Sequence, residues 1–160
     1  MPLNRYFYIL LTRCIIQRIF NDVVMAKTWT EKYNNGKEHQ VKSVDKKFAD
    51  IEAGEKMLIA TPKIIDEYIR QIPIGAETSL KTIRNDLAIE LNADKTCPVT
   101  TGIFLRIVAE KAYEEWENGI PEDQITPFWR VIDKKAPIVK KLSFSFDFIE
   151  KQRKKEGLPV

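Results

Sequence analysis

Residues 61–91, which read TPKIIDEYIRQIPIGAETSLKTIRNDLAIEL, contain the pattern that decides the fold. Thr61 can cap a helix with its hydroxyl group, and Pro62 suits the first helical position because that position needs no N–H donor. Apolar residues then recur at intervals of three and four, which predicts a helix over residues 62–71. The proline and glycine of IPIG, at residues 72–75, end this helix in a tight turn.

Two further helices follow this turn. Thr78 or Ser79 can cap a helix over residues 80–91. A longer helix is predicted over residues 99–118, with Ile103 among its inward-facing side chains. A helix, a turn and a second helix that begins with small hydroxylated residues is the arrangement of helix-turn-helix DNA-binding proteins. Helix pairs also occur in many other proteins, so the pattern alone does not decide function.

Short apolar segments on both sides of the helices predict a small strand element. Residues 56–60 (KMLIA) and residues 129–132 (WRVI) are both predicted as strands. A closing helix rich in lysine and arginine is predicted over residues 147–156, before Gly157. The predicted fold class is therefore α/β and mostly α: a winged-helix-like helix-turn-helix domain with a small strand element.

Composition divides the chain into three segments. Residues 1–24 mix apolar residues with arginines and differ from the rest, so we expect an upstream extension, with the methionine that follows as the initiator. Residues 25–55 are predicted as a polar arm, extended or loosely ordered, with Trp29 and Phe48 as anchors. The domain itself is expected over residues 56–158.

The net charge of the chain is mildly basic, at +3. Residues 1–24 contribute two of these charges, because three arginines stand against one aspartate, so the remainder carries +1. A protein that binds nucleic acid through electrostatics alone usually carries a larger or more clustered excess. The charge therefore permits an anionic partner without requiring one.

The sequence carries no signal for a membrane span, a metal site or a disulfide framework. The longest apolar run of the first segment, residues 6–11, is far shorter than the roughly 20 residues that a spanning helix needs. We therefore expect no membrane partner and a cytoplasmic location. His39 is the single histidine, and Cys14 and Cys97 lie far apart. We expect no metal, no cofactor and two reduced thiols, with one disulfide as the alternative.

Four segments occur in the order of the motifs of a known protein family. They are IPIGAETSLKTI at residues 72–83, TTGIF at 100–104, PFWRVI at 127–132 and FIEKQRKKEG at 148–157. In turn they resemble the motifs IPxGxVxTYGxIA, RAVGxAL, PCHRVI and KxxLLxxEG of the C-terminal domain of O6-alkylguanine-DNA alkyltransferases. The resemblance covers roughly residues 57–157 and implies a DNA-binding domain.

The resemblance also implies that the family's chemistry is lost. Phe128 stands at the position of the methyl-accepting cysteine and Trp129 at that of its histidine, so thiolate chemistry cannot occur there. Val99 stands at the position of the arginine that fills the gap left by a flipped nucleotide, and Leu80 at that of the tyrosine that pushes the phosphate. The chain is closest in character to the non-catalytic alkyltransferase-like proteins, which hold an alkylated base without repairing it.

The resemblance implies a base pocket formed by Phe128, Trp129 and Arg130. Aromatic faces stack on bases with roughly 1–3 kcal/mol each. Because neighbouring residues of a strand point to opposite faces, we expect one ring in the core and the other in the pocket or at the surface. Arg130 can either bond the backbone of the turn or reach a phosphate.

Five residues are candidates for DNA contacts: Lys81, Val99, Thr100, Thr101 and Arg106. The two threonines begin the long helix, where hydroxyl and N–H groups suit phosphates or base edges, and helix capping explains them equally well. Lys81 and Arg106 are candidate phosphate partners, although Arg106 can instead pair with Glu110. Val99 can serve only as an apolar wedge.

The predicted function is DNA binding or lesion sensing without methyl transfer, with double-stranded DNA, plain or alkylated, as the partner. The alternative is a protein-interaction module that keeps the fold without binding DNA, which the low net charge and the replaced arginine and tyrosine favour. An enzyme of unknown chemistry is the third interpretation. The lack of a nucleophile paired with a base argues against it.

Overall fold

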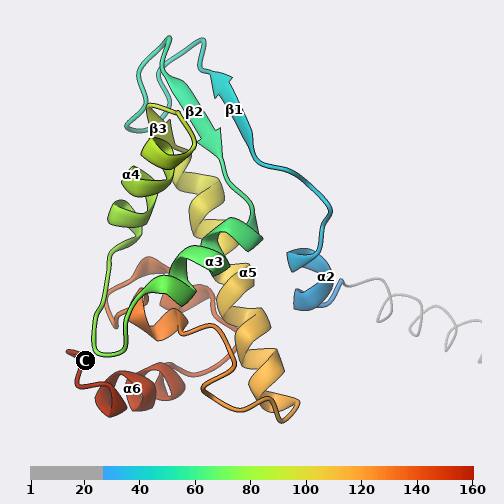
Figure 1. Cartoon of the computed structure of the whole chain (residues 1–160), viewed down its shortest axis with the longest axis vertical. Coiled ribbons are helices and arrows are strands. Elements are labelled where there is room, and N and C mark those ends of the chain that lie inside the picture. The colour runs from blue at the N-terminus through green and yellow to red at the C-terminus, as the bar shows by residue number, and fades with distance from the viewer. Residues whose placement is uncertain (1–26) are drawn as a thin grey trace, which may run out of the picture.

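The computed structural model describes residues 27–160, so the predicted extension at residues 1–24 lies outside the described residues. The described chain is α/β with mostly helices and a small three-stranded sheet, as predicted. In order, its elements are α2 (Trp29–Tyr33), β1 (Gln40–Ser43), β2 (Lys56–Ile59), α3 (Pro62–Gln71), α4 (Leu80–Glu90), β3 (Lys95–Thr96), α5 (Pro98–Glu117), the 3-10 helices η1 (Phe128–Arg130) and η2 (Pro137–Lys141), and α6 (Phe146–Lys155) (Figure 1).

The predicted helices form close to their predicted bounds. The Thr61 hydroxyl accepts a hydrogen bond from the N–H of Ile64 at 3.3 Å and so caps α3. The Ser79 hydroxyl accepts from the N–H of Thr82 at 3.0 Å and caps α4. Each cap supplies a partner to an N–H group that the helix itself leaves unpaired. Among residues 27–160, no helix combines the length and the apolar character that crossing a membrane demands.

The turn between α3 and α4 depends on Gly75. Its φ of +76° lies in the left-handed region that disfavours residues with a Cβ atom, and a Cβ there would lie 3.4 Å from the backbone oxygen of Glu156. The N–H of Gly75 donates to the carboxylate of Glu156 at 3.2 Å. The turn therefore packs closely against the C-terminal end of α6.

The polar arm is more ordered than predicted. β1 pairs antiparallel with β2, with Gln40 opposite Ile59, and β2 pairs parallel with β3, with Met57 opposite Lys95. All four residues of β1 are exposed, so within residues 27–160 the strand is held mainly by its backbone hydrogen bonds to β2. The helix α2 adds a second ordered element to the same arm (Figure 1). Of the two predicted anchors, Trp29 is half-buried and Phe48 is 40% exposed.

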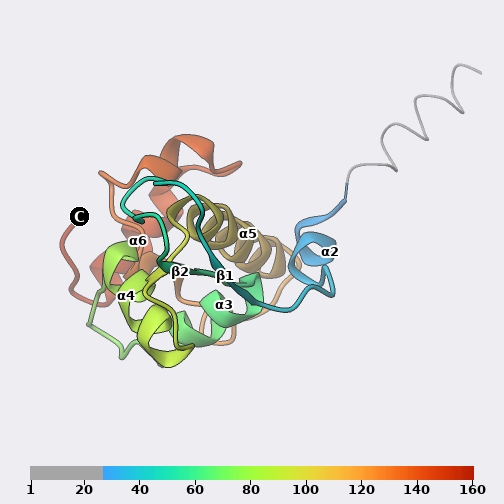
Figure 2. The ribbon, with the colours of Figure 1, turned by 90° about the horizontal axis from the view of Figure 1, so that it is seen from above.

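The long helix α5 is the element against which most of the others pack. The elements α2, α3, α4, η1 and η2 all contact it, and Figure 2 shows it passing between α3 and the C-terminal segments. Leu105, Ile107 and Val108 of α5 are buried in the core. Ile103 is 52% exposed, so its predicted inward orientation is wrong. Ile103 instead lines a groove on the surface of α5 that the other elements of residues 27–160 leave open.

Candidate functional site

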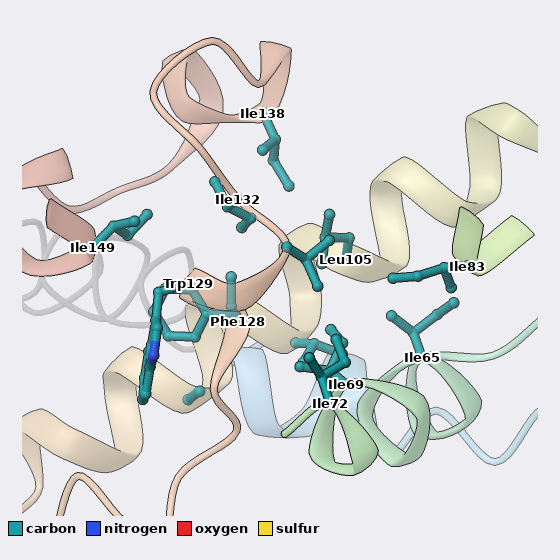
Figure 3. Packing of buried hydrophobic residues seen from close by; sticks show 14 of the residues in the cluster. Ile65, Ile69, Ile72, Ile83, Leu105, Phe128, Trp129, Ile132, Ile138 and Ile149 are labelled. Atoms are coloured by element: carbon teal, nitrogen blue, oxygen red, sulfur yellow. The ribbon is translucent and has the colours of Figure 1, made fainter. Parts of the chain in front are cut away.

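The PFWR segment, residues 127–130, lies in the core. It forms the 3-10 helix η1, so the predicted strand over residues 129–132 is wrong. Phe128 is 0% and Trp129 4% exposed, and Figure 3 shows both rings among apolar side chains of the core. The prediction that one ring faces the pocket or the surface is therefore also wrong. The Phe128 ring lies 6.0 Å from that of Phe148, centroid to centroid, in a stacked arrangement.

Buried polar contacts explain why Trp129 and Arg130 both turn inward. The indole N–H of Trp129 donates to Glu156 at 2.9 Å, and two nitrogens of Arg130 donate to the two carboxylate oxygens at 2.8 Å each. The third guanidinium nitrogen of Arg130 donates to the carbonyl of Ile72 at 2.5 Å. Arg130 thus supports the backbone of the turn, one of its two predicted roles, and all three of its nitrogens are engaged.

We call Glu156, with its partners Trp129, Arg130 and Gly75, the Glu156 clasp. Burial of Glu156 opposes its ionisation, but hydrogen bonds from Arg130, Trp129 and Gly75 outweigh burial and hold the pKa of Glu156 below its usual range. The clasp joins the end of α6 to η1 and to the turn between α3 and α4. The segment predicted to bind a base therefore holds the helix pair together.

A groove of about 1120 Å³ lies beside this core, between the beginnings of α4 and α5 and residues 131–141. Its apolar lining includes Leu80, Val99 and Ile103, and α2 closes it with Trp29. Pockets for small molecules measure roughly 300–1,000 Å³. The groove exceeds that range, and it is open to solvent along an exposed part of α5, so it suits a larger ligand.

The groove carries an excess of positive charge. Its lining holds four basic side chains, Lys32, Arg106, Lys135 and Lys141, and two acidic ones, Glu77 and Asp133. The two acidic groups have partners within the protein. Glu77 pairs with Arg153, and Asp133 accepts a hydrogen bond from the N–H of Lys135 at 2.8 Å. Among residues 27–160, none of the three lysines forms an ion pair.

Some of the predicted contact residues line this groove and others do not. Val99, which is 54% exposed, and Arg106 both line it. Lys81 is exposed outside its lining. Thr101 is buried, and its hydroxyl donates to the carbonyl of Cys97 at 2.6 Å, so it serves the helix itself. The Thr100 hydroxyl is buried and has no hydrogen-bond partner among residues 27–160.

Phe128, Trp129 and Arg130, predicted as the base pocket, lie outside the lining of the groove. The Arg106 side chain also forms the predicted alternative contact, since its Nε donates to Glu110 at 3.3 Å. That bond fixes the position of the guanidinium group and leaves its two terminal nitrogens without a hydrogen bond within residues 27–160. Arg106 can therefore support the helix and still meet a ligand.

Sequence reasoning missed the contribution of α2 to the groove. The signal for this helix is the capping box Thr28-x-x-Glu31. The Thr28 hydroxyl accepts from the N–H of Glu31 at 3.1 Å, and the Glu31 carboxylate accepts from the N–H of Thr28 at 2.7 Å. A helix that begins at Trp29 brings Lys32 to the same side one turn later.

Among residues 27–160, the lining of the groove offers binding groups and contains no cysteine that could accept a methyl group. Cys97, at the beginning of α5, is a free thiol, and it is buried. A thiol acts as a nucleophile in its thiolate form and needs access to its substrate, which burial denies. The exposed cations and apolar side chains can together hold an anionic ligand that has flat or apolar parts.

The comparisons with known proteins leave the family resemblance as an inference from four motifs. No protein-family model, curated protein or solved structure matches this chain. Function must therefore be inferred from the groove and from the residues that line it.

Proposed function

We propose that the protein binds double-stranded DNA, plain or alkylated, in this groove as a DNA-binding or lesion-sensing protein, and that it transfers no methyl group. The observation that carries the proposal is the unpaired positive charge of the groove, where Lys32, Lys135 and Lys141 form no ion pair within residues 27–160. Phosphates supply much of the affinity of proteins for DNA, and lysines that form no ion pair within the protein can meet them.

The arrangement of the three longer helices supports this proposal. We interpret α3, α4 and α5 as a winged-helix-like helix-turn-helix unit, in which α5 begins at the groove and packs against both of the others. The residue before α5, Cys97, makes no side-chain hydrogen bond to the helix, whereas Thr61 and Ser79 cap α3 and α4. Free N–H groups at the beginning of a helix favour phosphate oxygens.

The proposal is tested by fluorescence anisotropy with two labelled duplexes, one plain and one that carries a single O6-methylguanine. We expect both to bind at low salt and the affinity to fall as salt rises. Tighter binding of the alkylated duplex would support lesion sensing, and equal binding would support a general DNA-binding protein. Binding to neither duplex at modest salt would contradict the proposal.

Two lysines of the groove give a sharper prediction. We expect Lys135→Ala and Lys141→Ala each to weaken binding to both duplexes by a similar factor, because phosphate contacts carry no sequence information. Each substitution should also reduce the slope of log K against log salt concentration by about 1. Titrations at several salt concentrations measure this slope.

Lys63→Ala is the matched control for these lysines. Lys63 is exposed on α3, lies outside the lining of the groove and forms no ion pair within residues 27–160. Its removal should leave the slope unchanged. A slope that changes equally in Lys63→Ala and in the groove variants would show that the groove is not where the phosphates lie.

One observation favours the second candidate, a protein-interaction module. Val99 and Ile103 lie one helical turn apart on α5, are 54% and 52% exposed, and both line the groove. Exposed apolar side chains at this spacing are typical of surfaces that bind protein. Binding driven by apolar burial depends little on salt, so the salt dependence of a ligand in the groove separates the two candidates.

A further inference from the structure

We propose that a nucleobase of the bound nucleic acid stacks on Trp29, a base that is not stacked within the duplex. This inference rests on the proposed function, since it requires nucleic acid in the groove. Trp29 lies in α2, outside the four segments that carry the family resemblance. The helix therefore adds a ligand contact that those segments do not supply.

The chain has three tryptophans, and their surroundings differ. Trp129 is buried, and its indole N–H is bonded to Glu156. The ring of Trp116 packs against the ring of Phe148, with the centroids 4.8 Å apart. Trp29 alone lines the groove, and among residues 27–160 it is the only aromatic residue that does so. Within the described residues, Trp29 is therefore the one aromatic partner that the groove offers to a flat ligand group.

The helix α2 is anchored by residues other than Trp29. The hydroxyl of Tyr33 donates to the buried carboxylate of Asp66 at 2.6 Å, and its ring packs against the hydrophobic core. Burial and this hydrogen bond raise the pKa of Tyr33, so the phenol stays protonated as a donor. The hydroxyl of Thr30 donates to Glu114 at 3.2 Å.

Trp29 is not part of the core cluster among residues 27–160. An indole ring that the helix does not need as an anchor, and that faces a groove, is a candidate for contact with a ligand. Tyr33 and Thr30 hold the helix whether or not a ligand is present. Because these anchors lie within one turn of Trp29, the ring has a defined position before a ligand arrives, which lowers the entropy cost of binding.

Two cations lie against the Trp29 ring. Lys32 Nζ lies 3.8 Å from the centroid of the ring, and the guanidinium carbon of Arg106 lies 5.2 Å from it. The bond to Glu110 holds Arg106 in this position. A nucleotide offers a flat base and an anionic phosphate. Lys32 lies over the ring, so a base that stacks on that face displaces the ammonium group, which can then meet the phosphate. The base and phosphate of a nucleotide are therefore complementary to this site. An aliphatic ligand would use neither the aromatic ring nor the two positive charges.

The test compares two fluorescein-labelled duplexes that are identical except that one carries a single unpaired guanine. We expect Trp29→Ala to weaken binding of the duplex with the unpaired base by about tenfold, the size of one lost base–aromatic contact. Binding of the fully paired duplex should change much less. Trp29→Phe, which keeps an aromatic face, should retain most of the affinity, and the salt slope should stay unchanged in both variants because no charge is removed.

Fluorescence supplies an independent readout. Tryptophan emission of the wild type should be quenched when the unpaired-base duplex binds, and this quenching should disappear in Trp29→Phe, where Trp116 and Trp129 remain. If Trp29→Ala fails to fold, the difference in quenching between the wild type and Trp29→Phe still shows whether a base stacks on Trp29.

The outcomes separate the two proposals. If the wild type binds both duplexes, and Trp29→Ala binds the unpaired-base duplex as tightly as the wild type, the inference is overturned and the proposed function stands. A loss in Trp29→Phe as large as that in Trp29→Ala would also overturn it, because aromatic contact would not be the cause. If the wild type binds no duplex, both proposals are overturned together.

Discussion

Replacing Phe128 with alanine should lower the free energy of unfolding by about 3–5 kcal/mol, the range for removing a fully buried aromatic side chain. Phe128 is 0% exposed, and its ring contacts those of Trp129, Phe144 and Phe148. The cavity left by the ring cannot fill with water, because its walls are apolar. Domains of this size are stable by roughly 5–15 kcal/mol, so the substitution removes a large share of the total. Urea denaturation followed by circular dichroism measures the change.

Phe48→Ala is the matched control for this experiment. It deletes the same side chain at a position that is 40% exposed, so the loss should be about 1 kcal/mol or less. If Phe128→Ala proves too unstable to fold, Phe128→Leu should fold with a smaller loss, because most of the volume is kept. Equal stability of Phe128→Ala and Phe48→Ala would contradict the buried position of Phe128. Phe128 would then again be a candidate for ligand binding.

Replacing Glu156 with glutamine should lower the free energy of unfolding by about 3 kcal/mol, near the lower end of the range for breaking a buried ion pair. Four donors face the carboxylate, from Gly75, Trp129 and Arg130. The amide of glutamine has only one oxygen to accept hydrogen bonds from these four donors. Its NH2 group is itself a donor and would face the donors that the oxygen does not reach. The side chains of Arg130 and Glu156 are only 10% and 12% exposed, so water cannot replace the lost contacts.

The effect of Glu156→Gln should depend on pH. The clasp lowers the pKa of Glu156 in the folded state, so the carboxylate binds its proton more weakly there than in the unfolded chain. Its contribution to stability is complete above the ordinary glutamate pKa of about 4.3 and is lost as pH falls through the lower folded-state value. The stability difference between wild type and variant, measured in urea from neutral to acidic pH, should therefore shrink in acid.

Glu150→Gln controls for the removal of a negative charge from α6. Glu150 pairs with Lys154 at 2.5 Å, but the two side chains are 31% and 63% exposed, and exposed pairs contribute little. We expect a change of about 0.5 kcal/mol or less, with little dependence on pH. A pH-dependent loss of the same size in both variants would mean that the net charge of α6, and not the clasp, is responsible.

The helices could be predicted from the sequence because their signals are local. The Thr61 and Ser79 hydroxyls that mark two helix starts in the sequence make the capping hydrogen bonds in the structure. The orientation of one side chain of α5 could not be predicted in the same way. Spacing places Ile103 inward together with its apolar neighbours, and it cannot show that the adjacent surface is an uncovered groove.

The conformation of η1 could not be predicted, because the partners that decide it are distant in sequence. The segment WRVI has the apolar, β-branched character of a strand. Trp129 and Arg130 instead bond Glu156, which lies 27 and 26 positions further along the chain. No pattern within the segment carries that information, and the long-range contact overrides the local preference.

The candidate site was predicted only in part for the same reason. Val99, predicted from the family resemblance, and Arg106, predicted as a phosphate partner, both line the groove. Trp29 and Lys32 reach it because Tyr33 bonds Asp66 of α3, 33 positions away, and Thr30 bonds Glu114 of α5, 84 positions away. The capping box Thr28-x-x-Glu31 could have predicted the helix, and nothing local could have predicted where it docks.

The Glu156 clasp has a consequence for how the protein folds. The two helices joined by Gly75 are neighbours in sequence, yet Glu156 bonds Gly75 across 81 positions and Arg130 bonds Ile72 across 58. Local helices form quickly, whereas contacts of this span must first overcome the entropy of closing a long loop. The angle between α3 and α4 is therefore acquired late, when the chain condenses as a whole.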